Sequence, residues 1–237
     1  MTLTDDARAK LAAVSTATLT TCLFKRGLRT RFIQDVHPIN PAAPRMVGPA
    51  YTLRYIPARE DLDVMDAYAD FEHPQRKAIE SCPPGHVLVM DSRKDARAAS
   101  AGDILVTRRM VRGCAGFVTD GGFRDTPTIA TLPFPAYHAR PSAPTGPILH
   151  HAVDIGQPIA CGDVAVFPGD IMVGDGEGVV VVPAHLAQEI AAEAFEMTAY
   201  EDFVEAQVRA GRRIFGIYPA TAESRAEFAA WRRDHGR

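Results

Sequence analysis

Residues 98–125 constrain the fold of this chain more than any other stretch of its sequence. Small residues lead into Asp103, a residue type favoured at helix N-caps, and Gly113 is a typical helix stop. The apolar run at 115–119 predicts a short buried strand, and the Asp-Gly-Gly sequence at 120–122 predicts a tight reversal after it. The stretch is therefore expected to form a helix, a strand and a turn in close succession.

This unit places a helix N-terminus beside a charged loop, because Arg124 and Asp125 follow the turn directly. Free backbone N–H groups at a helix N-terminus suit a small anion, and carboxylates suit a hard divalent cation. The planar guanidinium of Arg124 suits a carboxylate, to which it can donate two parallel hydrogen bonds. A surface loop with a local ion pair is the alternative interpretation of the two residues.

Apolar patterning predicts helices at both ends of the chain and strands between them. Residues 4–26 are typical of a helix, with a break at 15–18, and residues 183–210 predict a long helix with one apolar stripe. Strands are predicted at 51–56, 87–90, 164–167, 171–173 and 179–182, with hairpin turns between the last three. His150 and His151 lack the spacing of metal ligands and are expected to be exposed loop residues.

Composition excludes several classes of protein. The 237 residues are 46% hydrophobic and 23% charged, which is ordinary for a globular domain, and the formal net charge of −3 argues against a nucleic-acid coat. The four cysteines lie far apart without zinc-site spacing. The N-terminus does not resemble a signal peptide, and no apolar run approaches the ~20 residues of a membrane helix. A cytoplasmic location is therefore expected, without a membrane or nucleic-acid partner.

The central stretch resembles the RraA-like family. The match consists of Gly102-Asp-Ile-Leu105 and of Arg-Gly-Cys-Ala-Gly-Phe-Val-Thr-Asp-Gly-Gly-Phe-Arg-Asp at 112–125, and the resemblance extends over residues 12–215. The family includes divalent-metal-dependent 4-hydroxy-4-methyl-2-oxoglutarate aldolases, non-enzymatic regulators of ribonuclease E, and members mislabelled as menaquinone methyltransferases. The Asp-Gly-x-x-Arg-Asp portion is the specific part of the match.

The resemblance implies an α/β fold of the swivelling β/β/α type, with helices packed around a mixed central sheet or barrel. One RraA-like domain is expected over 1–237, with a core at 12–215 and a C-terminal tail at 216–237. A homo-oligomer, either a trimer or a hexamer, is also implied.

The resemblance further assigns roles to individual residues. It assigns five residues to binding the 2-oxo acid: Gly102, Asp103, Ile104, Leu105 and Arg124. Asp125 is expected to bind Mg²⁺ or Mn²⁺, and the residues expected to be catalytic are Arg124, Asp125 and Glu201. In the aldolases, a glutamate on a late helix reaches a neighbouring subunit's metal site, and Glu201 is the best match here. Glu201 falls within the apolar stripe of its predicted helix, where a carboxylate must be paired, protonated or metal-bound.

An aldolase needs an electron sink for the enolate that develops, either a Schiff-base lysine or a metal ion. The four lysines of the chain lie in polar or helix-end settings, where burial would not depress an amine pKa: Lys10, Lys25, Lys77 and Lys94. The sequence therefore favours a metal-dependent pyruvate aldolase acting on a 4-hydroxy-2-oxo acid, with oxaloacetate decarboxylation as a side activity. The alternatives are a ribonuclease E regulator without activity and a lyase or hydratase acting on a sugar-derived 2-oxo acid.

Overall fold

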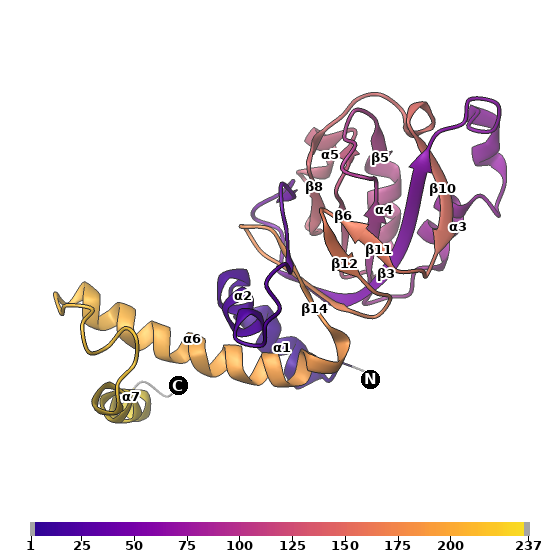
Figure 1. Cartoon of the computed structure of the whole chain (residues 1–237). Helices are drawn as coiled ribbons and strands as arrows, with labels where there is room; N and C mark the ends of the chain where they lie inside the picture. The colour runs from indigo at the N-terminus through magenta and orange to yellow at the C-terminus, as the bar shows by residue number, and fades with distance from the viewer. Residues whose placement is uncertain (1–2, 235–237) are drawn as a thin grey trace.

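The curled central sheet is built around β3 (Met46–Pro57) in the computed structural model, which describes residues 3–234. One edge of β3 pairs in parallel with β4 (Val87–Asp91). Its other edge pairs antiparallel with β13 (Ile171–Gly174) near its start and with β10 (His150–Ile155) near its end. Because β3 changes partner along one edge, it joins the two halves of the curled sheet (Figure 1).

The sheet is mixed and has the strand order β1-β14-β13-β3-β4-β6-β8-β2, with β10 on β3. Its remaining strands are β1 (Phe32–Ile33), β2 (His37–Pro38), β6 (Gly116–Thr119), β8 (Ala136–His138) and β14 (Val179–Val182). The strands β3, β4, β6 and β8 run parallel, and all side chains of β4 and β6 are buried. Burial on both faces explains the uninterrupted apolar sequences of these two strands.

Two smaller sheets complete the β structure. One contains β5 (Ala99–Ala101), β7 (Gly122–Phe123) and β9 (Arg140–Pro141) in parallel. The other is a hairpin of β11 (Ile159–Cys161) and β12 (Val164–Val166). The predicted hairpin turn at 168–170 is wrong, because β12 pairs with β11 while β13 pairs with β3 and β14. The turn leads from the small hairpin back to the central sheet.

Two groups of helices cover the sheet. Near the parallel strands lie α3 (Pro74–Ser81), α4 (Asp103–Val111) and α5 (Thr126–Ile129), and their apolar residues share a core with β4 and β6. A second core joins α1 (Asp5–Ala13), α2 (Thr16–Phe24) and the start of α6 (Ala187–Arg209) to β13 and β14. The 3-10 helices are η1 (Met65–Ala69), η2 (Gly146–Ile148) and η3 (Ala184–Leu186). This arrangement confirms the predicted α/β fold with a mixed sheet and flanking helices.

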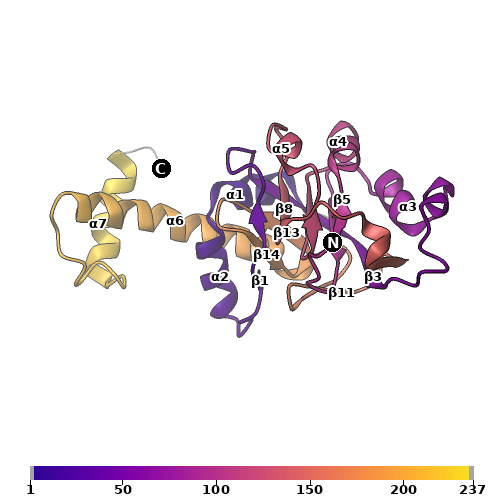
Figure 2. The same cartoon turned by 90° about the horizontal axis from the view of Figure 1, so that it is seen from above.

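The long helix α6 leaves the body of the protein and carries α7 (Ala222–Asp234) at its far end (Figures 1 and 2). A small core of Phe203, Val204 and Ile217, joined by Phe228 and Trp231, packs α7 against α6. The segment expected to be a tail thus forms a helical arm. The arm leaves Ile214, Phe215 and Tyr218 exposed, with Phe215 82% accessible. Within residues 3–234, no helix combines the length and apolar character that a membrane span requires.

Candidate active site at the N-terminus of helix α4

The residues predicted from the central stretch line one cavity of about 320 Å³ beside the N-terminus of α4. Its walls come from η1, α3, the β5–α4 junction, the loop after β7, and η2. The predicted residues that line it are Gly102, Asp103, Ile104, Leu105, Arg124 and Asp125. Segments more than 20 residues apart in the sequence therefore meet at one place, as the Asp-Gly-Gly turn led us to expect.

Pairing of β5 with β7 brings Gly102 against the charged loop. Ala101 lies beside Phe123 in this pair, and the backbone N–H of Arg124 donates to the Ala101 carbonyl at 3.0 Å. A Cβ atom on Gly102 would lie 2.8 Å from Oδ2 of Asp125 and 2.9 Å from Cγ of Arg124. These separations are too short for any side chain, so glycine at 102 permits both charged residues to approach the start of α4.

Arg124 and Asp125 form an ion pair at the cavity, with 3.2 Å between Nε and Oδ2. Their side chains are 45% and 39% accessible, so water screens the pair and it adds little stability. Asp125 has a left-handed backbone, with φ of 57°, and stands at the N-cap of α5. Residues held in this region of the φ/ψ map cluster at functional sites. The alternative interpretation of these two residues is a surface loop with a local ion pair. The ion pair is present, and it faces the cavity.

The N-terminus of α4 begins one residue earlier than predicted. Gly102 is the N-cap, and Asp103 is the first helical residue. The first helical amides have no acceptor within the helix, as at any helix N-terminus. Oδ1 of Asp103 accepts from the N–H of Ile104 at 2.8 Å. An incoming carboxylate therefore competes with Asp103 for this amide.

Behind the cavity, a buried polar network fixes the Asp-Gly-Gly turn. Asp120 accepts backbone hydrogen bonds from Ser92 at 2.6 Å, Lys94 at 3.1 Å and Gly162 at 3.1 Å. Burial raises the pKa of Asp120 to about 6, against the opposing effect of these hydrogen bonds. A Cβ atom on Gly121 would lie 2.6 Å from Cβ of Ser92, so the turn requires glycine there as well. Asp120 is thus a structural residue that ties the turn to neighbouring loops.

A family model described as Aldolase/RraA matches residues 11–181. The chain belongs to the RraA-like family. A protein of Halalkalibacterium halodurans that carries the provisional name 4-hydroxy-4-methyl-2-oxoglutarate aldolase is 33% identical over 154 residues, which are 65% of this chain and 67% of that protein.

Solved structures agree with this membership. RraAS2 of Streptomyces coelicolor, described as an unusual member of the RNase ES inhibitor RraA protein family, has a TM-score of 0.74 and 30% identity, covering 85% of this chain and 96% of its own. An uncharacterized protein of Pseudomonas syringae pv. tomato has a TM-score of 0.77 at 22% identity, covering 92% of this chain and 99% of its own. This second likeness concerns the fold alone.

Residues outside the central stretch also line the cavity, among them Tyr68, Gln75 and Arg76. The guanidinium of Arg76 lies 4.8 Å from the ring centroid of Tyr68. Gln75 is buried and donates to the Ser100 carbonyl at 2.7 Å, which attaches α3 to β5. Residues 57–82 and 127–147 carry no motif, but loop segments of this kind often carry binding residues. Both segments contribute to the cavity wall.

The carboxylates of Asp103 and Asp125 share this cavity. Within the described part of the chain, residues 3–234, no three His, Cys, Asp or Glu side chains form a cluster suited to a metal ion. Mg²⁺ commonly takes one or two carboxylates and keeps several waters. Because Gly102 has no side chain, the space beside it stays open and the Asp125 carboxylate is accessible. The donor set therefore fits a hydrated divalent ion.

Glu201 lies on the arm and does not line the cavity of its own chain. Its Oε2 accepts from the hydroxyl of Thr18 at 3.0 Å, so its partner here is a hydroxyl and not an arginine. The predicted role of Glu201 at a neighbouring subunit's site stays a prediction.

The expectation of exposed loop histidines is wrong for the pair at 150–151. Both residues belong to β10. His150 is buried, and one of its ring nitrogens, Nε2, lies 3.2 Å from the Ala98 carbonyl. His151 is half-buried, with Nδ1 2.9 Å from Oδ1 of Asp63.

Proposed function

We propose that this RraA-like protein is a divalent-metal-dependent aldolase that cleaves a 4-hydroxy-2-oxo acid to pyruvate and a carbonyl product. One observation carries the proposal: the amides at the start of α4, the Arg124 guanidinium and the Asp125 carboxylate converge on one cavity through the contact at Gly102. The amides suit the carboxylate of a 2-oxo acid, and the guanidinium suits its carboxylate and its 2-oxo oxygen. The Asp125 carboxylate suits a divalent ion that these substrate oxygens can also bind. The name of the Halalkalibacterium relative supports the same activity.

The chain's own groups hold the pyruvyl end of the substrate. Amides of Asp103, Ile104 and Leu105 receive the carboxylate at the positive end of the α4 dipole. Arg124 donates to the carboxylate and to the 2-oxo oxygen, where negative charge develops as the C3–C4 bond breaks. Asp125 would hold Mg²⁺ or Mn²⁺, which when bound supplies further stabilisation of that charge.

No lysine lines the cavity, so the residues present do not support a Schiff base there. Each lysine is ion-paired elsewhere: Lys10 with Asp6, Lys25 with Glu193, Lys77 with Glu72, and Lys94 with Asp163. The proton of the C4 hydroxyl is taken by a water molecule held by a cavity carboxylate. Asp103 is placed for this role once the substrate carboxylate has displaced it from the amide of Ile104.

Pyruvate release tests the proposal. The protein is incubated with a panel of 4-hydroxy-2-oxo acids and with oxaloacetate, in Mg²⁺, in Mn²⁺ or with a chelator, and pyruvate is followed by coupling to lactate dehydrogenase. We expect metal-dependent release that Asp125→Asn abolishes and Asp61→Asn does not, because Asp61 forms an exposed ion pair with Arg59 outside the cavity. Metal-independent release, or equal rates in both variants, contradicts the proposal.

The similarity to RraAS2 favours a second candidate, a protein-binding regulator of ribonuclease E. This candidate predicts inhibition of ribonuclease E by the purified protein and no pyruvate from any substrate. A lyase or hydratase acting on a sugar-derived 2-oxo acid is the third candidate. It predicts turnover of sugar-derived acids through the same Arg124 and Asp125.

The proposal includes a homo-oligomer, a trimer or a hexamer, in which the arm carries Glu201 to a neighbouring cavity. Support comes from the projection of α6 away from the body (Figure 2). The arm also exposes the apolar residues Ile214, Phe215 and Tyr218. Light scattering after size exclusion measures the assembly. A monomer at assay concentration contradicts this part of the proposal.

A further inference from the structure

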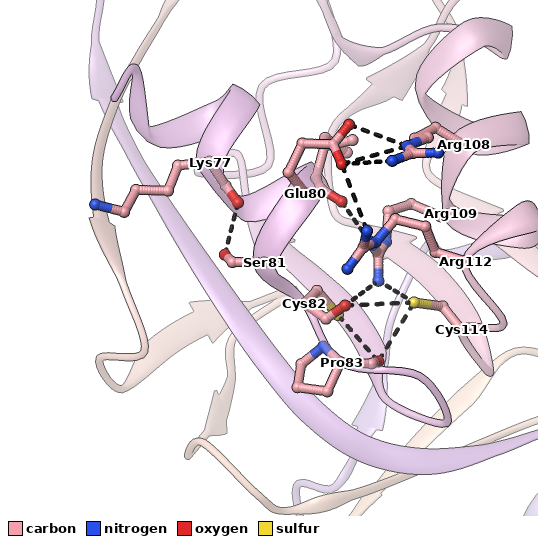
Figure 3. Close-up of polar contacts among 10 residues, drawn as sticks. Lys77, Glu80, Ser81, Cys82, Pro83, Arg108, Arg109, Arg112 and Cys114 are labelled. Carbon is pink, nitrogen blue, oxygen red and sulfur yellow. Dashed lines mark hydrogen bonds and ion pairs between the residues drawn. The ribbon is translucent and has the colours of Figure 1, made fainter. Parts of the chain in front are cut away.

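A pair of cysteines with a buried arginine lies at the opposite end of α4 from the candidate active site (Figure 3). Cys82 is the C-cap of α3, and Cys114 follows Gly113 just after α4. Both side chains are buried, and the Cys114 thiol donates to the Cys82 carbonyl oxygen at 3.9 Å. Sγ of Cys114 lies 3.5 Å from the carbonyl oxygen of Pro83. The pair therefore sits beneath the turn that leads from α3 into β4.

Arg109 lies between these elements and is completely inaccessible to solvent. It donates to the carbonyl of Ile79, to the carbonyl of Cys82 at 2.7 Å, and to Sγ of Cys114. Its Nε has no hydrogen-bond partner. Among residues 3–234, no carboxylate forms an ion pair with this guanidinium.

A fully buried cation without a carboxylate requires another source of negative charge. The C-terminal carbonyls of α3 supply part of it, because they form the negative end of that helix. Among residues 3–234, the ionisable acids in contact with the cluster are the two thiols. Of these, the Cys114 sulfur accepts directly from Arg109, so ionisation of Cys114 places a full negative charge against the guanidinium.

Other charged groups around the cluster favour the same charge on Cys114. Arg112 on α4 contributes a second positive charge. Glu80 on α3 is held by Arg108 at 2.8 Å and by Arg112 at 3.6 Å, which directs it away from the thiols (Figure 3). His86, at the start of the next strand, places Nδ1 3.2 Å from the Pro84 carbonyl.

The neighbouring Cys82 thiol and the charges of Arg109 and Arg112 lower the pKa of the Cys114 thiol to about 7, against the effect of burial. The neighbouring Cys114 thiol and burial raise the pKa of Cys82 well above its usual value. Burial raises the pKa of Cys22 to about 11 and that of Cys161 well above the ordinary value. The four cysteines thus provide one activated thiol, one neighbouring thiol and two internal controls.

We propose that Cys114 and Cys82 form a thiol modification site, in which Cys114 is a thiolate held by Arg109 and Cys82 is the resolving thiol. The reactant that this site fits is a small electrophile, such as hydrogen peroxide. The Cys114 thiolate attacks one peroxide oxygen, an S–O bond forms, the O–O bond breaks, and the departing hydroxide takes a proton to become water.

The Cys82 sulfur then attacks the sulfenic sulfur of Cys114. An S–S bond forms, the S–O bond breaks, and the departing hydroxide leaves as water with the Cys82 proton. Two thiols and one hydrogen peroxide thus give one disulfide and two waters. The site lies between α3 and α4, whose other ends line the cavity through Gln75, Arg76 and the α4 N-terminus.

Alkylation of the native protein tests the first half of this proposal. Iodoacetamide is added at a series of pH values from 6 to 9, and mass spectrometry resolves the rate at each cysteine. At pH 7 we expect Cys114 to react about tenfold or more faster than Cys22 and Cys161, with a midpoint near pH 7. Equal rates at the three cysteines, or a Cys114 midpoint near pH 9, overturn the proposal.

Two arginine variants separate the effect of Arg109 from a general change in charge. Arg109→Met removes the buried guanidinium, and we expect the Cys114 rate at pH 7 to fall about tenfold. Arg108→Met is the matched control, because Arg108 lies on the same helix with its charge directed at Glu80. Equal effects of the two variants contradict a specific role for Arg109. The wild-type comparison among cysteines stands even where Arg109→Met does not fold.

Hydrogen peroxide tests the second half. Peptide mapping of the treated protein should show a Cys82–Cys114 disulfide, with Cys22 and Cys161 still reduced. In Cys82→Ala, a 1,3-diketone probe should trap a sulfenic acid on Cys114, whereas in Cys114→Ala the same treatment should leave Cys82 unmodified. A sulfenic acid that persists on Cys114 of the wild type without a disulfide excludes Cys82 as the resolving thiol.

Discussion

The two ends of α4 each set an arginine against an acidic side chain, but in opposite environments. At the N-terminal end, Arg124 and Asp125 are 45% and 39% accessible and border a cavity. At the C-terminal end, Arg109 is 0% and Cys114 is 9% accessible. The Arg124–Asp125 pair and the Arg109–Cys114 pair therefore differ in how strongly their side chains interact, because water reaches the first pair and not the second.

The difference teaches which arginine can exchange its partner for a ligand. An exposed ion pair contributes little to folding, so a ligand can replace it at little cost. A buried pair cannot exchange partners without exposing an uncompensated charge to a poorly solvated interior. We therefore expect substitutions at the N-terminal end to affect activity, and substitutions at the C-terminal end to affect stability.

Arg109→Met should produce the largest loss of stability. Removing a buried guanidinium leaves the Ile79 and Cys82 carbonyls without a donor, and breaking a buried charged pair costs about 3–5 kcal/mol. Arg124→Met should cost less than about 1 kcal/mol, because its partner is exposed. Urea denaturation measures both free energies of unfolding. Equal losses in the two variants would remove the distinction between the two ends.

Arg124→Lys should cause a large loss of activity. Lysine keeps the charge but cannot donate two parallel hydrogen bonds to a carboxylate and a carbonyl. We expect pyruvate release to fall about 10²–10³-fold with unchanged stability. Arg59→Lys is the control, since its partner Asp61 lies outside the cavity. Full activity in Arg124→Lys would mean that the N-terminal pair is only a surface ion pair.

Two glycines at the ends of α4 allow a smaller and more specific comparison. In Gly102→Ala the new Cβ would collide with Arg124 and Asp125, and we expect an activity loss of about 100-fold from their displacement. Gly113 has a φ of +73° and its Cβ would meet nothing closer than 3.8 Å. Gly113→Ala should cost about 1–2 kcal/mol of stability without loss of turnover. An equal loss of activity in Gly113→Ala and Gly102→Ala would contradict the predicted difference between the two ends of α4.

The pH dependence of stability gives the smallest predicted effect. The Cys114 pKa is lowered from 9.0 to about 7 in the folded protein. The stability that its thiolate contributes is therefore fully present above pH 9 and is lost as the pH falls through 7. The difference in free energy of unfolding between wild type and Cys114→Ala should increase from pH 6 to pH 9 by on the order of 1 kcal/mol. Chemical denaturation across that range checks this, and a constant gap argues against a thiolate.

The candidate site could be predicted from the sequence where local rules determine it. The helix start near Asp103 and the Asp-Gly-Gly turn have strong local signatures, so their arrangement around Arg124 and Asp125 followed. The N-cap itself was misplaced by one residue, because Asp103 satisfies an amide of its own helix from the first helical position. This position for Asp103 is possible because Gly102 adopts the extended N-cap conformation.

Features that depend on distant partners could not be predicted. Arg109 is one of two arginines in α4, and its burial arises because α3 ends against α4. Helix α7 is rich in charge, and its contact with α6 depends on Phe228 and Trp231 meeting Phe203 across the turn of the arm. The buried His150 likewise depends on β10 pairing with β3. Tertiary contacts determine the burial of Arg109, the packing of α7 against α6 and the burial of His150.

The central claim is that the N-terminal end of α4 stabilises the enolate of pyruvate, and deuterium exchange into pyruvate measures this without knowledge of the physiological substrate. The protein is incubated with pyruvate and Mg²⁺ or Mn²⁺ in D₂O, and the methyl signal is followed by proton NMR. We predict metal-dependent exchange well above the buffer rate, abolished by a chelator and in Asp125→Asn, and retained in Asp61→Asn. Exchange no faster than in buffer with either metal would contradict the account.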